Sequence, residues 1–298
     1  MDLIQENELS ITGLITDKLR SYAAFFKLRL ASLVVFSAAF GYLIAADTID
    51  WQSFIWLSIG GFLVTGASNG YNQMIEVDLD KLMDRTKKRP LVTKKMSKPE
   101  AFIVATLSAI VGVAILWFFL NPLSGILGLF ALFMYVLLYT PLKRITPWAV
   151  FVGAFPGAIP PMLGYIAYTG KFGLEAGLLF ALQFMWQFPH FWAIAWKVDQ
   201  DYKKAGFYLL PSKGGKDKSS AFLILIYTLF MIMVSLLPMA FRLTGPISSV
   251  FFLLGGLLML IPSIKLFKDK SDKAATKVMF ASFIYVPIVL VAWYFDKI

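Results

Sequence analysis

Long apolar runs dominate the chain, and its polar residues gather in short segments between them. Runs of about 20 residues, enough to cross a hydrocarbon core of about 30 Å, occur near 28–46, 53–72, 101–119, 123–140, 148–168, 174–196, 220–240, 247–266 and 277–295. Spans in lipid must satisfy their own backbone hydrogen bonds, and these runs lack the alternation of barrel strands, so we expect helices. The pattern predicts an all-α polytopic membrane protein with about nine transmembrane helices.

The composition agrees with this pattern and narrows the available chemistry. Of the 298 residues, 58% are hydrophobic and 15% charged, whereas soluble domains have about 25% charged residues. There is no Cys, so chemistry would rest on carboxylates, amides, bases or a metal bound through oxygen. Apolar residues at helical spacing predict an interfacial helix in a lead-in, 1–27, that precedes a single membrane domain, 28–298. They are Ile11, Leu14, Ile15 and Leu19.

The basic residues are distributed very unevenly along the chain. The net charge is +10, and 25 of the 28 Lys and Arg fall in the N-terminal segment and in alternate loops, which would share one side of a membrane. The exceptions are Lys171, Arg242 and Lys297. By the positive-inside rule the N-terminus is cytoplasmic, and with nine spans the C-terminus is outside. The basic excess therefore indicates topology rather than binding to nucleic acid.

Asn72, Glu76 and Asp80 follow the second apolar run at intervals of four residues. This interval places the three side chains on one face of a helix, and Asp84 would extend the row if the helix continued. Carboxylates near a membrane are costly and usually mark a site. Three oxygen donors on one face suit Mg²⁺, which shares its shell with waters and substrate phosphates. We therefore expect a magnesium site here.

Two further stretches carry candidate binding residues. Arg85 and Arg89 are four residues apart in RTKKRPL, where their guanidinium groups would bind a diphosphate bridged to the metal. In residues 184–206, Lys197 and Asp201 have the same spacing. His190, the one His of the chain, follows Pro189 among aromatic residues. From its surroundings alone, a structural role is the better interpretation of His190.

Residues 72–91, NQMIEVDLDKLMDRTKKRPL, resemble the first aspartate-rich motif of the intramembrane prenyltransferase superfamily. Gln73 departs from that motif, because many members have Asp there. FFKLRLASLVVFSAAFG, YTPLKRITP, GAIPPMLGY and WQFPHFW followed by K-x-x-x-D-Y are similar to the protoheme IX farnesyltransferase family, the heme O synthases. This resemblance covers about residues 22–211. Trp148-Ala149 departs from the family, whose members more often have small or polar residues there. Lys197 departs from the superfamily, many of whose members have a carboxylate at that position.

The resemblance implies a helical bundle around a central cavity that opens to the cytoplasmic side. It implies transfer of a farnesyl group from farnesyl diphosphate to a vinyl group of heme B, with Mg²⁺ assisting ionisation of the allylic diphosphate. The implied metal ligands are Asn72, Glu76, Asp80 and Asp201, and these four together with Lys197 form the implied catalytic set. The implied diphosphate-binding residues are Arg85, Arg89, Lys143 and Lys197. The implied heme-binding residues are His190, Trp186 and Trp192.

The resemblance also implies a location in the bacterial inner membrane and, as partners, the lipid bilayer and a downstream heme A synthase or terminal oxidase assembly. RTxxRPL occurs across the superfamily, so an aromatic or quinone-precursor acceptor is the alternative to heme. The PHFW segment and Lys197 favour heme. A secondary transporter for an anionic solute is less favoured, because the charged residues lie at helix ends and no matching pair of broken spans is evident.

Overall fold

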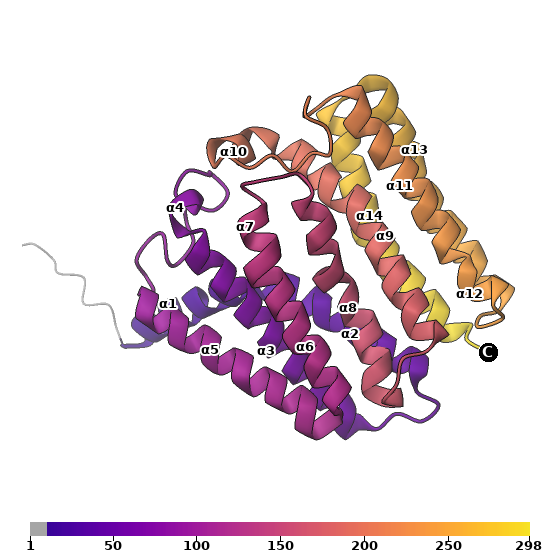
Figure 1. The fold of residues 1–298 in the computed structure, drawn as a ribbon, viewed down its shortest axis with the longest axis horizontal. Coiled ribbons are helices and arrows are strands. Elements are labelled where there is room, and N and C mark those ends of the chain that lie inside the picture. Colours follow the sequence, from indigo (N-terminus) through magenta and orange to yellow (C-terminus); the bar gives the residue numbers. More distant parts are fainter. Residues whose placement is uncertain (1–10) are drawn as a thin grey trace, which may run out of the picture.

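The computed structural model describes residues 11–298, which are almost entirely helical (Figure 1). Within these residues no strand occurs, and Thr244 and Lys297 form only an isolated antiparallel bridge. The prediction of an all-α protein is therefore confirmed. Residues 1–10 of the predicted lead-in lie outside the described residues.

Long helices build the bundle, and shorter elements lie at its ends or continue the long ones. The long helices are α2 (Leu28–Ala45), α3 (Trp51–Ile75), α5 (Lys98–Ile115), α6 (Pro122–Phe133), α8 (Ala149–Thr169), α9 (Leu174–Lys197), α11 (Lys218–Ser235), α13 (Pro246–Asp269) and α14 (Asp272–Phe295). The π-helical segments η1 (Leu116–Leu120) and η2 (Met134–Tyr139) continue α5 and α6. The other helices are α1 (Ile11–Phe26), α4 (Val77–Asp80), α7 (Thr140–Leu142), α10 (Asp199–Lys204) and α12 (Leu237–Ala240).

Seven helical segments of the described chain are long and apolar enough to cross a membrane. They are Leu28–Ala45, Lys98–Leu120, Pro122–Leu142, Ala149–Thr169, Lys218–Ala240, Pro246–Asp269 and Asp272–Phe295. The predicted spans 53–72 and 174–196 fall on α3 and α9, which have 25 and 24 residues but a less apolar composition. The protein is thus an integral membrane protein, while the number of nine spans stays a prediction.

α2 and α8 pack with their backbones in close contact. A Cβ atom added at Gly164 would lie 1.8 Å from the carbonyl oxygen of Ala38, and one added at Gly41 would lie 1.9 Å from that of Pro161. Small residues permit such approach between membrane helices, where close packing replaces the hydrophobic drive. α8 also packs on α9, and α9 packs on α11 and α14. These contacts join the two halves of the chain into one bundle.

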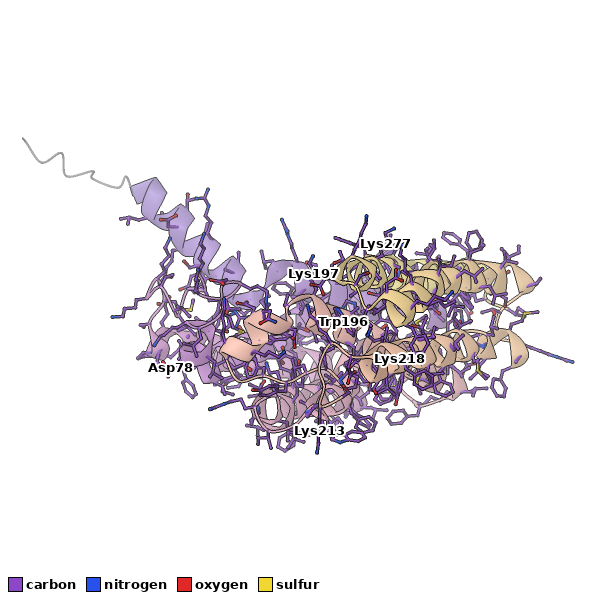
Figure 2. All side chains as sticks on the ribbon, turned by 90° about the horizontal axis from the view of Figure 1, so that it is seen from above. Asp78, Trp196, Lys197, Lys213, Lys218 and Lys277 are labelled. Carbon is purple, nitrogen blue, oxygen red and sulfur yellow. The ribbon has the colours of Figure 1, made fainter. Side chains whose placement is uncertain are left out.

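Charged side chains gather at one end of the bundle. Figure 2 looks onto this end, where Asp78, Lys197, Lys213, Lys218 and Lys277 lie. The same end carries α4 and α10, seen at the top of Figure 1. This distribution agrees with the predicted grouping of the basic loops, and the assignment of this end to the cytoplasm stays a prediction.

Helix α1 lies against α3 and α2 and is tied to the start of α5 by an ion pair between Lys18 and Glu100, 2.6 Å long. Leu14, Ile15 and Leu19 are exposed on its surface. An apolar surface on a helix beside charged loops is typical of a segment that lies in the membrane interface. The interfacial position of α1 remains a prediction.

Candidate active site

Asn72, Glu76 and Asp80 lie on one face across the junction between α3 and α4. Glu76 caps α3, yet the backbone bonds from Glu76 N to Asn72 O (3.0 Å) and from Asp80 N to Glu76 O (2.8 Å) carry the helical register through the junction. All three side chains are buried, with exposed fractions of 2%, 4% and 1%. The helix ends at Asp80, so Asp84 does not extend the row.

These side chains line a pocket with a volume of about 110 Å³ at the charged end of the bundle. This space holds several water-sized groups, so it suits a metal ion and phosphate groups rather than a macrocycle. We call it the donor pocket. Its lining residues are Lys27, Asn72, Glu76, Asp80, Met83, Arg85, Arg89, Tyr135, Tyr139, Lys143, Tyr202 and Phe207.

In the donor pocket each of the three oxygen donors faces a different cation. The pairs are Lys27 with Asn72 (Nζ to Oδ1, 3.3 Å), Lys143 with Glu76, and Arg89 with Asp80 (Nη1 to Oδ2, 2.5 Å). Burial lowers the pKa of Lys27 to about 7, and the neighbouring Arg89 and Lys143 contribute to this shift. Burial raises the pKa of Asp80, while the charge of Arg89 opposes that shift. The pocket thus holds charges that are paired but poorly hydrated.

The oxygen donors of the pocket fit a magnesium ion. Asp80 Oδ1 is buried and has no hydrogen-bond partner among the described residues, although buried polar atoms are rarely left unpaired. The carboxylate of Glu76 and the amide oxygen of Asn72 lie on the same face. The described chain contains no cluster of three or more His, Cys, Asp or Glu that would hold a metal alone. Waters and phosphate oxygens would therefore complete the shell, as Mg²⁺ prefers.

Aromatic rings surround the cations of the donor pocket. The ammonium group of Lys143 lies 5.0 Å from the ring centre of Tyr139 and 5.5 Å from that of Phe207. The guanidinium carbon of Arg85 lies 5.7 Å from the ring centre of Tyr202. These distances are within the range of cation–π attraction, so the rings already favour positive charge at this place.

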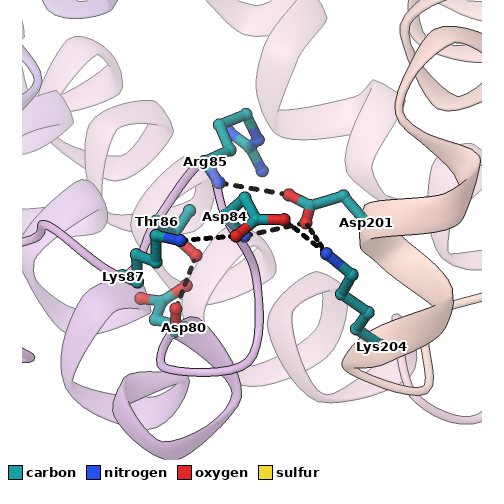
Figure 3. A network of polar contacts seen from close by, with 7 residues as sticks. All are labelled: Asp80, Asp84, Arg85, Thr86, Lys87, Asp201 and Lys204. Atoms are coloured by element: carbon teal, nitrogen blue, oxygen red, sulfur yellow. Dashed lines mark hydrogen bonds and ion pairs between the residues drawn. The ribbon is translucent and has the colours of Figure 1, made fainter.

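Asp201, predicted as a metal ligand, does not line the donor pocket. Its Oδ1 accepts a hydrogen bond from the backbone N–H of Asp84 (2.8 Å), and its Oδ2 accepts one from that of Arg85 (3.2 Å). Lys204 pairs with Asp84 and also lies 3.5 Å from Asp201. We call these contacts the loop latch (Figure 3). Both oxygens of Asp201 already bind backbone amides of the loop, and the residue lies outside the pocket lining, so its role as a ligand stays a prediction.

The loop latch fixes the segment that carries Arg85 to the pocket. Figure 3 shows the latch reaching back to α4, where the hydroxyl of Thr86 donates to the carbonyl of Asp80 at 2.9 Å. Hydrogen bonds from Lys204 and then Lys87 lower the pKa of Asp84 to about 2. Asp84 is therefore charged at neutral pH, and its pairing with Lys204 is maintained there.

Lys197 also lies outside the donor pocket. Its ammonium group is 5.8 Å from the ring centre of Phe280 on α14, and Figure 2 shows it at the end of the bundle. The structure therefore brings Arg85, Arg89 and Lys143 together with the oxygen donors, but not Lys197. Its predicted contact with a diphosphate remains untested.

The predicted heme-binding residues lie on two sides of α9. His190 is 6% exposed, and its Nδ1 is 2.7 Å from Ser282 Oγ on α14. Trp186, one turn earlier, stacks on the imidazole with ring centres 4.3 Å apart. Trp192 instead faces α11, with its ring 5.0 Å from that of Tyr227. Of the three predicted residues, only His190 and Trp186 therefore lie together, and Ser282 contacts the first of them. We call His190, Trp186 and Ser282 the acceptor cluster.

Several residues that line the donor pocket were not predicted from the sequence. Tyr139 begins the YTPLKRITP segment, so its position beside Lys143 gave a signal. No sequence signal marked Lys27, because its charge was explained by the positive-inside distribution of the basic residues. Gln73, the departure from the aspartate-rich motif, donates to the carbonyl of Phe25 (2.7 Å) and is not part of the pocket lining. Its amide therefore removes no oxygen donor from the pocket.

A sequence profile of the UbiA prenyltransferase family matches residues 34–285. A protein named protoheme IX farnesyltransferase from Christiangramia forsetii is 50% identical over 276 residues, which are 91% of each chain. One of the same name from Flavobacterium psychrophilum is 48% identical over 279 residues, 91% of this chain and 92% of the other.

Two solved structures share the fold. A structure described as digeranylgeranylglyceryl phosphate synthase has a TM-score of 0.78 at 20% identity, over 94% of this chain and 98% of the other. A UbiA homolog from Archaeoglobus fulgidus bound to GPP and Mg²⁺ has a TM-score of 0.61 at 12% identity, over 91% and 99%. At these identities the two structures establish the arrangement of the helices alone.

Proposed function

The chain belongs to the UbiA prenyltransferase family, and from this membership we propose that it transfers a farnesyl group from farnesyl diphosphate to a vinyl group of heme B, giving heme O. The name shared by relatives about half identical along nearly the whole chain supports the acceptor. One observation supports binding of farnesyl diphosphate. Asn72, Glu76 and Asp80 each face a cation in the pocket, and a diphosphate could bind these cations in their place.

The cations of the pocket would bind the diphosphate by exchanging partners. Arg89 and Lys143 now pair with Asp80 and Glu76. When a diphosphate enters, these cations would turn to its oxygens, and the carboxylates would be released to a metal. Mg²⁺ bound there would neutralise the charge that develops on the leaving diphosphate. Fixed charges in a poorly hydrated site stabilise such a transition state without reorganising solvent.

The aromatic rings of the pocket suit the positive charge that develops on the farnesyl chain when the diphosphate leaves. Ionisation breaks the bond between C1 of the farnesyl chain and the diphosphate oxygen and leaves an allylic cation. The vinyl group attacks C1 with its electron pair, and water adds to the resulting cation with loss of one proton. Tyr135, Tyr139 and Tyr202 line the pocket beside the cations, where their faces would stabilise the allylic charge by about 0.5–2 kcal/mol each.

We propose that the charged end of the bundle faces the cytoplasm of a bacterial inner membrane, since the basic loops gather there. Farnesyl diphosphate would then place its anion in the donor pocket and its chain among the apolar helices. The product would pass to a heme A synthase or to terminal oxidase assembly.

The test of this function is conversion of heme B by the purified protein. Incubation with heme B, farnesyl diphosphate and MgCl₂ should give a heme with one hydroxyethylfarnesyl group, detected by mass spectrometry. Chelation of divalent cations should abolish the product, and their return should restore it. Prenylation of a phenolic acceptor without any prenylated heme would contradict the proposed acceptor. Undiminished turnover after chelation would contradict the metal site.

A further inference from the structure

Ser282 on α14 connects to both members of the acceptor cluster on α9. Its side-chain oxygen lies 2.7 Å from Nδ1 of His190. Its carbonyl oxygen accepts a hydrogen bond from the indole N–H of Trp186 at 2.9 Å. The indole and imidazole rings are stacked at an interplanar angle of 18°. One residue of α14 therefore fixes the orientation of two neighbouring rings of α9.

The hydrogen bonds of Ser282 determine where the imidazole carries its proton. The hydroxyl has a single proton, and it donates this proton to the carbonyl of Met279 at 2.6 Å. The same oxygen must then act as the acceptor toward His190, so Nδ1 of the ring is the donor. In a neutral imidazole only one nitrogen carries a proton. Nε2 is therefore left with a free electron pair.

Nε2 of His190 takes no part in any hydrogen bond within the described part of the chain. The residue is 94% buried, since only 6% of its surface is exposed. Nε2 is not one of the buried side-chain atoms that lack a hydrogen-bond partner, so the small exposed part of the residue includes this nitrogen, and its electron pair is open to an external partner. A His that ligates a metal typically donates its other N–H to an acceptor that fixes its orientation. The pair His190 and Ser282 has this arrangement before any metal is bound.

We infer that Nε2 of His190 is an axial ligand of the iron in the heme substrate, and that Ser282 is the positioning residue that holds the ring in the required tautomer. This inference rests on the proposed function. Binding forms one dative bond from Nε2 to iron, and no proton has to leave because the nitrogen is already unprotonated. Trp186, stacked on the imidazole and bonded to Ser282, prevents the ring from rotating. The ligation would fix the vinyl groups of the macrocycle relative to α9.

Heme binding to the full-length protein in nanodiscs tests the ligand directly. Wild-type protein titrated with ferrous heme B should show an iron–imidazole stretching band in resonance Raman spectra. The variant His190→Ala should lose this band, and added imidazole should restore a nitrogen ligand. Persistence of the same band in His190→Ala would overturn the inference.

Two serine variants then separate positioning from packing. Ser282→Ala should keep heme but lower the iron–imidazole frequency and weaken heme binding about 10-fold, the scale of losing one partner of a metal-bound His. The matched control is Ser263→Ala, because Ser263 is also fully buried and donates to a helix carbonyl at 2.7 Å, that of Met259 on α13. This control should leave band and affinity unchanged. Equal spectra for wild type and Ser282→Ala would refute the positioning role.

Activity measured on the same samples distinguishes failure of this inference from failure of the proposed function. If wild-type protein farnesylates heme but shows no iron–imidazole band, the function stands and the inference falls. If it neither binds nor farnesylates heme, both fall.

Discussion

The donor pocket and the acceptor cluster obtain their polar groups in different ways. The pocket draws most of its charged groups from one continuous stretch, residues 72–89, where helical spacing groups the oxygen donors and the loop after Asp80 brings back Arg85 and Arg89. The cluster depends on His190 and Ser282, which are 92 positions apart. In the pocket, oppositely charged groups neutralise one another. In the cluster, a neutral ring is oriented by a hydroxyl group. The comparison indicates that local sequence determines recognition of the anion, whereas packing between helices determines recognition of the acceptor.

The largest expected effect is loss of a carboxylate charge from the donor pocket. Glu76→Gln and Asp80→Asn should each lower kcat about 10²- to 10³-fold, the scale of removing one preorganised electrostatic group. Steady-state turnover with saturating heme measures this effect. The substitutions change packing very little, so protein yield and helicity should stay at the wild-type level.

Asp78→Asn is the matched control for these variants. Asp78 lies between the two carboxylates in sequence, but its side chain is 79% exposed and, among residues 11–298, forms an ion pair with Lys81 alone. Its removal should change turnover less than twofold, since exposed ion pairs are worth about 0–1 kcal/mol. If Asp78→Asn proved as damaging as Asp80→Asn, the burial of the row would have no bearing on catalysis.

The sequence predicted the helical class and the row of oxygen donors, because both follow from periodicity within single segments. The grouping of Arg85 and Arg89 with Asp80 followed from their closeness in sequence, although both arginines lie in the loop after the helix ends. Lys27 and Phe207 were not predicted, since they reach the pocket only through packing of segments far apart in the chain. Asp201 has the spacing of a metal ligand, but the fold of the loop gives both of its oxygens to backbone amides. The tautomer of His190 depends on Ser282, which no motif marked.

Gly157→Ala should disturb the acceptor side alone. An added Cβ would lie 2.0 Å from Oε1 of Gln187 on α9, one turn before His190, so α9 or the Gln187 side chain must shift. Overpacking of this kind costs about 1–3 kcal/mol, visible as a lower Tm in thermal unfolding. Heme affinity should fall, while binding of farnesyl diphosphate with Mg²⁺ should not.

Gly177→Ala on α9, the helix that Gly157→Ala would push, provides the comparison. An added Cβ there meets nothing within 4 Å, so the Tm should be equal to or above that of wild type, since Ala favours helix over Gly by about 1 kcal/mol. Equal loss of donor and heme binding in Gly157→Ala would show that the two sites are mechanically coupled and would weaken the comparison.

A smaller effect should follow from releasing the loop latch. Asp201→Ala removes the acceptor of two loop amides, and Arg85 would lose its fixed position. A hydrogen bond to a charged group is worth about 1.5–3 kcal/mol, so the KM for farnesyl diphosphate should rise about 10- to 100-fold with kcat nearly unchanged. A loss in kcat comparable to that of Asp80→Asn would instead identify Asp201 as a member of the metal site. Asp199→Asn, whose partner is Lys203 on the same helix, serves as control.

The most direct test of two separate sites is a crossed binding measurement on two variants. Calorimetric titration of Asp80→Asn and His190→Ala with farnesyl diphosphate plus Mg²⁺, and separately with heme B, gives four affinities to compare with wild type. The account predicts that Asp80→Asn weakens binding of farnesyl diphosphate with Mg²⁺ and keeps heme binding, whereas His190→Ala keeps donor binding and loses heme binding. Parallel loss of both ligands in either folded variant would contradict it.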